Sequence, residues 1–386
     1  MKAFSERSRQ IQPFHVMRLL SEARDLEAQG KDIVHMEVGE PDFATPAPIM
    51  AAGIKALNEG RTHYTPALGL PALREAISGY YQTRYGLDIS PQRIAITPGA
   101  SGALQLLMAL LVEPGDEVLM SDPGYPCNRN IVHLYGGTPV PVVVASKDNY
   151  QLNADAINKN WNNALTRGVI VTTPSNPTGT VLDRQTLKGI HSAVTAREGF
   201  LIVDEIYQGL VYDALDMTAL ELGSDVYAVN SFSKYFGMTG WRVGWLVAPE
   251  HAIPELDKLA QNLFLATATP SQYAALAAFS EESRGILEQR RERFQARRDF
   301  LLPALEGIGF HFPYTPRGAF YLYGDCSEVA QDSGSLATQL LENAGVAVTP
   351  GMDFSVSNPS SYLRFAYTTS RERLAEGVDR IRRSCI

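Results

Sequence analysis

The sequence predicts an α/β protein built on a mostly parallel sheet, with a smaller α+β unit toward the C-terminus. Two observations predict this fold class. Through the middle of the 386-residue chain, short apolar segments rich in β-branched residues alternate with helix-like stretches. This alternation is typical of a parallel sheet that helices bury on both faces. From about residue 285, a long charged helix is followed by strands and helices in mixed order.

The strands of the central sheet are expected within residues 93–97, 116–126, 168–181, 199–207, 225–234 and 241–250. Residues 98–111 (PGASGALQLLMALL) follow the first strand and predict a helix that opens with small residues. In the C-terminal part, a helix is expected over residues 335–343 and another at the end of the chain.

Composition narrows the class of protein. A hydrophobic content of 45% with 20% charged residues indicates a packed core. A net charge of −8 argues against a broad nucleic-acid surface, and the arginine-rich residues 288–300 are interpreted as a solvated helix face. The start, MKAFSERSRQ, has no apolar core of a signal peptide, and no apolar run reaches the ~20 residues of a membrane span. We therefore expect a cytoplasmic protein with no membrane partner.

Several kinds of site are not indicated by the sequence. The cysteines are Cys127, Cys326 and Cys385, an odd number without CxxC spacing, which argues against a disulfide framework and a zinc site. The histidines lack metal-ligand spacing, so no metal is expected. No Walker A or GxGxxG motif is found. Ser101 is a poor nucleophile-elbow candidate because Ala103 replaces the last glycine of GxSxG.

Polar residues gather where the predicted strands end. Ligands in open α/β sheets bind beyond the carboxyl ends of the strands. Each residue alone has an ordinary explanation, such as a helix cap or a solvated lysine. Together they offer a lysine, a carboxylate, a phenol, an amide and a small-residue anion cradle. They are Thr97 to Ser101, Tyr125, Asn176, Asp204, Tyr207 and Ser231 to Lys234.

These groups match the needs of pyridoxal phosphate. A desolvated lysine in a cation-rich pocket attacks aldehydes, so Lys234 would meet the cofactor's aldehyde as a Schiff base. The pyridinium nitrogen needs a carboxylate, for which Asp204 is the candidate. Tyr207 and Asn176 can donate to the 3′-oxygen. The phosphate would lie at the helix start formed by Gly99, Ala100 and Ser101, together with the forked guanidinium of Arg242.

The motifs resemble those of the class I/II aminotransferases, which are fold-type I pyridoxal-phosphate enzymes of the aspartate aminotransferase superfamily. The resemblance covers nearly the whole chain, and six motifs occur in the family's order. They are VGEPDFATP (38–46), THYTPALGLPALREAI (62–77), SNPTGT (175–180), VDEIY (203–207), SFSKYFGMTGWRVG (231–244) and YLRFAYT (362–368).

The resemblance implies an architecture and an assembly. Residues 46–284 would form a large cofactor-binding domain with a seven-stranded sheet, and residues 285–386 a small domain that the N-terminal arm, residues 1–45, joins. The family also implies a homodimer with shared active sites.

The resemblance further implies individual roles. Lys234 would form the Schiff base and move the proton between substrate and cofactor, Asp204 would pair with the ring nitrogen, and Tyr207 and Asn176 would hold the 3′-oxygen. Tyr125 would stack on the ring. Arg364 would bind the substrate α-carboxylate with Gly39 and Asn176. The phosphate would be held by Gly99, Ala100, Ser101, Ser231, Ser233, Arg242 and Tyr64 of the partner subunit.

The resemblance implies transfer of an amino group from an L-amino acid to a 2-oxo acid by a ping-pong mechanism. An alternative of the same fold is a β-C–S lyase. A third hypothesis is a regulatory protein that senses the cofactor. Relatives of that kind carry an N-terminal DNA-binding domain, and the roughly forty residues before VGEPDF are too few for one. No arginine aligns with the second arginine of dicarboxylate-specific members, and Ile11 and Phe14 could lie over the pocket. An apolar or aromatic donor, with 2-oxoglutarate or pyruvate as acceptor, is therefore favoured.

Overall fold

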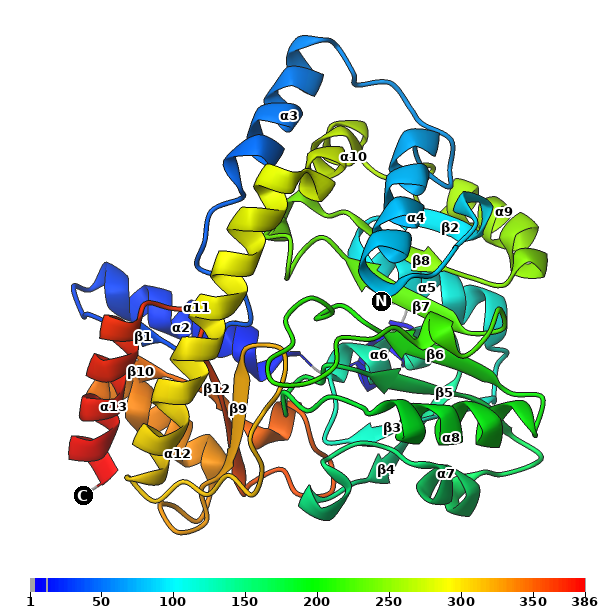
Figure 1. Ribbon diagram of the computed structural model, residues 1–386. Coiled ribbons are helices and arrows are strands. Elements are labelled where there is room, and N and C mark those ends of the chain that lie inside the picture. The colour runs from blue at the N-terminus through cyan, green and yellow to red at the C-terminus, as the bar shows by residue number, and fades with distance from the viewer. Residues whose placement is uncertain (1–3, 12, 386) are drawn as a thin grey trace.

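The computed structural model describes residues 4–11 and 13–385, and its centre is a seven-stranded sheet (Figure 1). Its strands are β2 (Ile94–Thr97), β3 (Glu117–Asp122), β4 (Thr138–Val143), β5 (Thr166–Thr172), β6 (Phe200–Asp204), β7 (Tyr227–Ser231) and β8 (Gly244–Val247). They lie in the order β2-β8-β7-β6-β5-β3-β4. Only β8 runs antiparallel to its neighbours within this sheet. The predicted mostly parallel α/β sheet is confirmed.

Strand β4 is the member of this sheet that the apolar-run pattern does not predict. Its sequence, TPVPVV, contains Pro139 and Pro141, which cannot donate backbone hydrogen bonds. The strand lies at the edge of the sheet and pairs only with β3. Prolines are tolerated at such an edge because one side of the strand needs no ladder partner.

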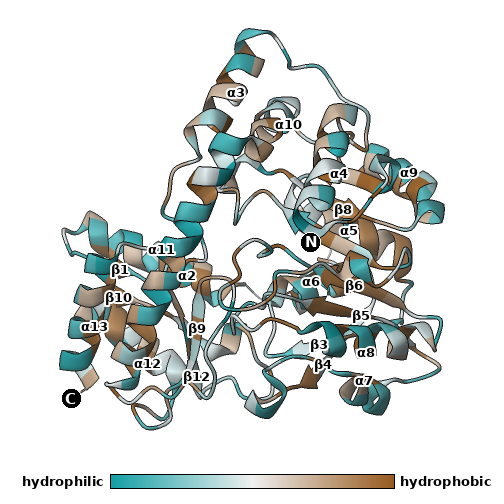
Figure 2. Ribbon diagram, viewed as in Figure 1, coloured by the Kyte–Doolittle hydropathy of each residue, from teal (hydrophilic) through white to brown (hydrophobic). Residues whose placement is uncertain are grey.

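Helices cover both faces of the central sheet. They are α4 (Pro71–Tyr85), α5 (Gly99–Leu111), α6 (Pro126–Leu134), α7 (Ala154–Asn160), α8 (Arg184–Thr195) and α9 (Ile253–Leu263). Beyond them, α3 (Ala47–Asn58) packs against α10 (Thr269–Leu276), which packs in turn against α4. Within β5, Ile170 packs with residues of α5, α6 and α9, whereas Val169 and Val171 pack with residues of α7 and α8. Burial on both faces explains the continuous apolar strands, which are brown in Figure 2.

Both ends of the chain contribute to a smaller group of elements beside the sheet. These are α2 (His15–Ala28), β1 (Val34–His35), α11 (Glu281–Glu306), β9 (Tyr321–Asp325), α12 (Ser333–Gln339), β10 (Val346–Ala347), β11 (Thr349–Pro350), β12 (Tyr362–Ala366) and α13 (Arg371–Cys385). The first helix, α1 (Glu6–Gln10), instead contacts α6. Strand β1 of the N-terminal segment pairs with β10 of the C-terminal part. The predicted boundary at residues 284/285 falls inside α11, and the division into domains stays a prediction.

The interpretation of residues 288–300 as a solvated helix face is wrong for part of that segment. Phe294, Arg297 and Arg298 of α11 are buried. Arg297 donates to both carboxylate oxygens of Asp42 at 2.8 Å, and its guanidinium lies 5.0 Å from the ring centre of Phe43. The arginines reach partners on other segments, which a helical pattern alone does not reveal.

No helix within residues 4–11 and 13–385 is both long enough and apolar enough to cross a membrane.

Candidate active site

The predicted site residues converge on one pocket of about 270 Å³. Thr172, Asp204 and Ser231, which line it, are the last residues of the neighbouring strands β5, β6 and β7. The pocket therefore lies at the carboxyl ends of parallel strands, where the topology places ligands. The predicted residues that line it are Gly39, Ala100, Ser101, Tyr125, Asn176, Asp204, Tyr207, Ser231, Ser233, Lys234, Arg242 and Arg364.

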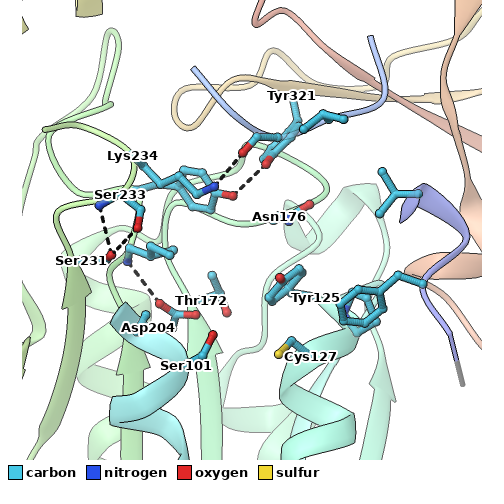
Figure 3. A pocket seen from close by; sticks show the side chains of 18 of the residues that line it. Ser101, Tyr125, Cys127, Thr172, Asn176, Asp204, Ser231, Ser233, Lys234 and Tyr321 are labelled. Carbon is cyan, nitrogen blue, oxygen red and sulfur yellow. Dashed lines mark hydrogen bonds between the residues drawn. The ribbon is translucent and has the colours of Figure 1, made fainter. Parts of the chain in front are cut away.

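Lys234 lies three residues beyond the end of β7, and its side chain points into this pocket (Figure 3). Its Nζ atom donates a hydrogen bond to the Gly39 carbonyl oxygen at 2.6 Å. Burial lowers the pKa of Lys234 to about 8; Glu40 opposes this shift, and the charges of Arg364 and Arg242 add to it. A sizeable fraction of the amine is therefore neutral near neutral pH and able to act as a nucleophile.

Asp204 is buried at the end of β6 without a cationic partner among the described residues. One carboxylate oxygen accepts a hydrogen bond from the backbone N–H of Ile206 at 3.2 Å. Burial raises the pKa of Asp204 to about 7. A buried acid of this kind is stabilised in its charged form by a nearby cation, such as a protonated ring nitrogen.

The start of α5 and the guanidinium of Arg242 meet at one place. Gly99 has a φ of +72°, and a Cβ atom there would lie 2.7 Å from a terminal nitrogen of Arg242. Glycine therefore permits the close approach, although Gly99 itself does not line the pocket. The hydroxyls of Ser231 and Ser233, 3.0 Å apart, lie in the same pocket. A helix N-terminus, a guanidinium and two hydroxyls together form a suitable site for a phosphate.

Arg364 is a buried cation on β12. Its guanidinium lies between the rings of Tyr321 and Phe354, 4.4 and 4.7 Å from their centres. It donates to Asn176 Oδ1 at 2.9 Å and to the Glu37 carbonyl oxygen. Its Nε atom has no hydrogen-bond partner among the described residues. A buried guanidinium that bonds only neutral oxygens is well placed to bind an incoming carboxylate.

Two phenols connect the central sheet to the smaller group of elements. The hydroxyls of Tyr207 and Tyr321 are 2.8 Å apart, and both side chains are buried. Burial, and next the neighbouring Tyr321, raise the pKa of Tyr207 well above its usual range. Tyr321 both packs in the buried core and lines the pocket. A Cβ atom at Gly39 would lie 1.8 Å from its hydroxyl, so this approach requires glycine.

Two of the residues predicted to bind the cofactor do not line the pocket of this chain. Gly99 supports it from behind, as described above. Tyr64 is 82% exposed, and its predicted contact involves a partner subunit. Of the two residues expected over the pocket, Phe14 lines it and Ile11 does not.

Other lining residues were not predicted. Thr172 ends a predicted strand, so the strand-end rule could have found it. Six further lining residues do not lie at strand ends, so that rule could not have found them. They come from helix starts, a helix interior and a turn, and their neighbours in the pocket are distant in sequence. They are Val16, Met17, Leu104, Cys127, Asp353 and Phe354.

Fold and site together give an α/β protein with a buried lysine, a buried carboxylate and a cluster of anion-binding groups in one pocket. The family model "Aminotransferase class I and II" matches residues 31–381. A transaminase from Methanocaldococcus jannaschii that acts on (5-formylfuran-3-yl)methyl phosphate is 37% identical, over 98% of each chain. A valine–pyruvate aminotransferase from Mycobacterium tuberculosis is 35% identical, over 96% of each chain. The crystal structure of an aminotransferase from Mycobacterium tuberculosis superposes with a TM-score of 0.96 at 34% identity, covering 100% of this chain and 99% of that one. The chain belongs to the class I and II aminotransferases.

Proposed function

We propose that this aminotransferase uses pyridoxal 5′-phosphate, held by Lys234, to move an amino group from an L-amino acid to a 2-oxo acid in a ping-pong mechanism. The observation that carries the proposal is the pairing of two buried groups in one pocket. Lys234 is a lysine with a lowered pKa, and Asp204 is a carboxylate with a raised pKa and no cation. An aldehyde on a protonated pyridine ring satisfies both groups at once.

The pocket residues fit this cofactor. Asp204 would face the ring nitrogen, and Tyr207 with Asn176 would face the 3′-oxygen. Tyr125 would cover one ring face. The phosphate would be held by Ala100, Ser101, Ser231, Ser233 and Arg242, with Gly99 admitting the arginine. When bound, the cofactor supplies a ring that accepts the electron pair released when the substrate's Cα–H bond breaks.

The chain's own groups then bind the substrate and move its proton. Arg364 would hold the α-carboxylate through its free Nε–H and a terminal nitrogen, which orients the Cα–H bond. Neutral Lys234 Nζ would take the proton from Cα and return it on the cofactor side. The hydrogen bond to the Gly39 carbonyl shows that this amine reaches the edge of the pocket that faces the N-terminal segment.

We also propose the assembly that the sequence predicts, a homodimer in which Tyr64 of each chain completes the phosphate site of the other. The 82% exposure of Tyr64 in the single chain leaves it available for such a contact. The cytoplasmic location stays a prediction.

A half-reaction screen tests the proposal. Each amino acid is added to the cofactor-loaded enzyme without any 2-oxo acid, and absorbance of the lysine-bound cofactor is followed. We expect one equivalent of 2-oxo acid per site, loss of the absorbance band, and its return on adding a 2-oxo acid. Repeated release of pyruvate and ammonia from cystathionine, without amino transfer, would instead indicate the lyase alternative.

A further inference from the structure

Asp353 connects three parts of the pocket. Its carboxylate oxygens accept hydrogen bonds from the backbone N–H groups of His15 and Val16, each at 2.8 Å. These groups belong to the first turn of α2, where N–H groups have no partner within the helix. Asp353 as a whole residue is 4% exposed. The residue at the N-cap of α2, Phe14, supplies no side-chain hydrogen bond to the helix. Asp353, 338 residues beyond His15, caps the helix in its place.

The backbone of Asp353 extends this connection to the substrate side of the pocket. Its carbonyl oxygen accepts a hydrogen bond from Arg129 of α6 at 2.9 Å. The next residue, Phe354, covers the guanidinium of Arg364. The first turn of α2 is therefore fixed next to the group assigned to the substrate α-carboxylate.

The wall that this turn contributes is apolar. Phe14, Val16 and Met17 line the pocket, and the ring of Phe14 lies 6.3 Å from that of Tyr125. Leu104 and Cys127 line it from the central sheet's side, and Figure 3 shows Cys127 beside Tyr125. Burial raises the pKa of Cys127 to about 11, so its thiol is uncharged near neutral pH.

Within one chain, the described residues that line the pocket leave no cation to pair with a second carboxylate. Among the described residues that line the pocket, the cations are Lys234, Arg242 and Arg364. The proposed function assigns each of them to the cofactor or to the α-carboxylate. An acidic side chain would have to bury its charge against apolar groups, which is unfavourable.

We propose that the amino donor carries an uncharged, apolar side chain, and that Asp353 is the positioning residue that holds the wall of Phe14, Val16 and Met17 against this side chain. The proposal rests on the proposed aminotransferase function. A substrate held by Arg364 presents its side chain to that wall. If the helix cap is lost, the wall is held less firmly, and the enzyme should discriminate less well between large apolar and small side chains of the donor.

The test compares donors in the cofactor-loaded enzyme with one fixed 2-oxo acid. The wild-type protein is expected to have a higher kcat/KM for L-phenylalanine or L-leucine than for L-aspartate. Asp353→Ala is expected to lower the ratio of kcat/KM for L-phenylalanine to that for L-alanine by about tenfold, mainly through KM. L-Alanine is the reference because its methyl group does not extend far from Cα, so it reports any general effect on Arg364.

Two further variants separate positioning from folding. Asp332→Ala removes a matched helix-capping carboxylate, which accepts from Ser335 N at 2.7 Å at the start of α12, and it should leave the donor ratio unchanged. Phe14→Ala removes part of the wall without removing the cap and should lower the ratio in the same direction as Asp353→Ala.

Three outcomes would each contradict a different part of the proposal. Equal losses for L-phenylalanine and L-alanine in both Asp353→Ala and Phe14→Ala overturn the positioning role. A wild-type preference for L-aspartate over every apolar donor overturns the substrate class. If no amino acid removes the absorbance band of the wild-type enzyme, the proposed function itself fails, a result distinct from the other two.

Discussion

Lys234 and Gly39 meet across the active-site pocket, with the lysine Nζ atom 2.6 Å from the glycine carbonyl oxygen. They are 195 residues apart in sequence. Lys234 lies just after β7 of the central sheet, whereas Gly39 lies just after β1 in the N-terminal segment. Because a side chain at position 39 would collide with the Tyr321 hydroxyl, glycine allows three separate segments to meet at the amine.

Replacing Lys234 with alanine should abolish turnover. The amine is proposed both to hold the cofactor and to move the substrate's proton, so we expect kcat to fall by more than about a thousandfold. Steady-state assays and an absorbance spectrum check this. Lys258→Ala is the matched control, because Lys258 is 64% exposed and pairs with Glu255 on α9. Retention of repeated turnover in Lys234→Ala would contradict the role.

Loading of the cofactor should depend on pH through the same amine. Only neutral Lys234 attacks an aldehyde, and its pKa is lowered from 10.5 to about 8. The rate at which the cofactor-free protein binds pyridoxal phosphate should therefore rise with pH, with a midpoint near pH 8. Stopped-flow absorbance measures the profile. A midpoint near 10.5, the ordinary value for lysine, would show that burial does not act on this group as described.

Arg364→Lys should weaken binding of both substrates. A lysine cannot reproduce the forked geometry of the guanidinium, nor its position between Tyr321 and Phe354. We expect KM to rise roughly 10- to 100-fold for the amino acid and for the 2-oxo acid, with unchanged absorbance of the bound cofactor. Arg382→Lys, on the exposed face of α13 next to Asp379, is the control. An unchanged KM would remove Arg364 from the substrate site.

Mixed dimers test whether active sites are shared. Tyr64→Ala and Lys234→Ala proteins are each expected to have low activity. When subunits of the two exchange, half of the dimers should combine both kinds of chain, and each of these has one site with native Tyr64 and native Lys234. Activity should recover to about a quarter of the wild-type level in an equal mixture that pairs at random. If mixing restores nothing, Tyr64 does not act across an interface.

Arg297→Ala should destabilise the fold more than the neighbouring Arg293→Ala. Arg297 is buried, forms a two-pronged ion pair with Asp42, and packs 5.0 and 5.3 Å from the ring centres of Phe43 and Phe294. Arg293 is exposed and lies 5.8 Å from the ring centre of Phe43. Removing the buried partner should cost about 2–3 kcal/mol, at the low end for buried pairs because Asp42 keeps some exposure. Thermal unfolding measures the difference, and equal melting temperatures would contradict it.

Much of the central sheet could be predicted from the sequence because burial on both faces produces apolar runs that are visible locally. The rule fails at β4, where two prolines interrupt the pattern at an edge that tolerates them. The helical pattern of α11 likewise did not predict that Arg297 is buried, because its partner Asp42 is 255 residues away. A helical repeat does not contain that information.

The sequence by itself determined which chemical groups the site would hold. Asp204, Ser231 and Lys234 lie at or just beyond strand ends, and parallel strands bring their ends to one edge whatever the loops do. The tertiary structure alone decided which further groups line the pocket. Asp353, Val16 and Leu104 come from a turn, a helix start and a helix interior, and they meet only because the smaller group of elements packs against the sheet. Contacts between distant segments depend on packing of the whole chain, so no local pattern records them.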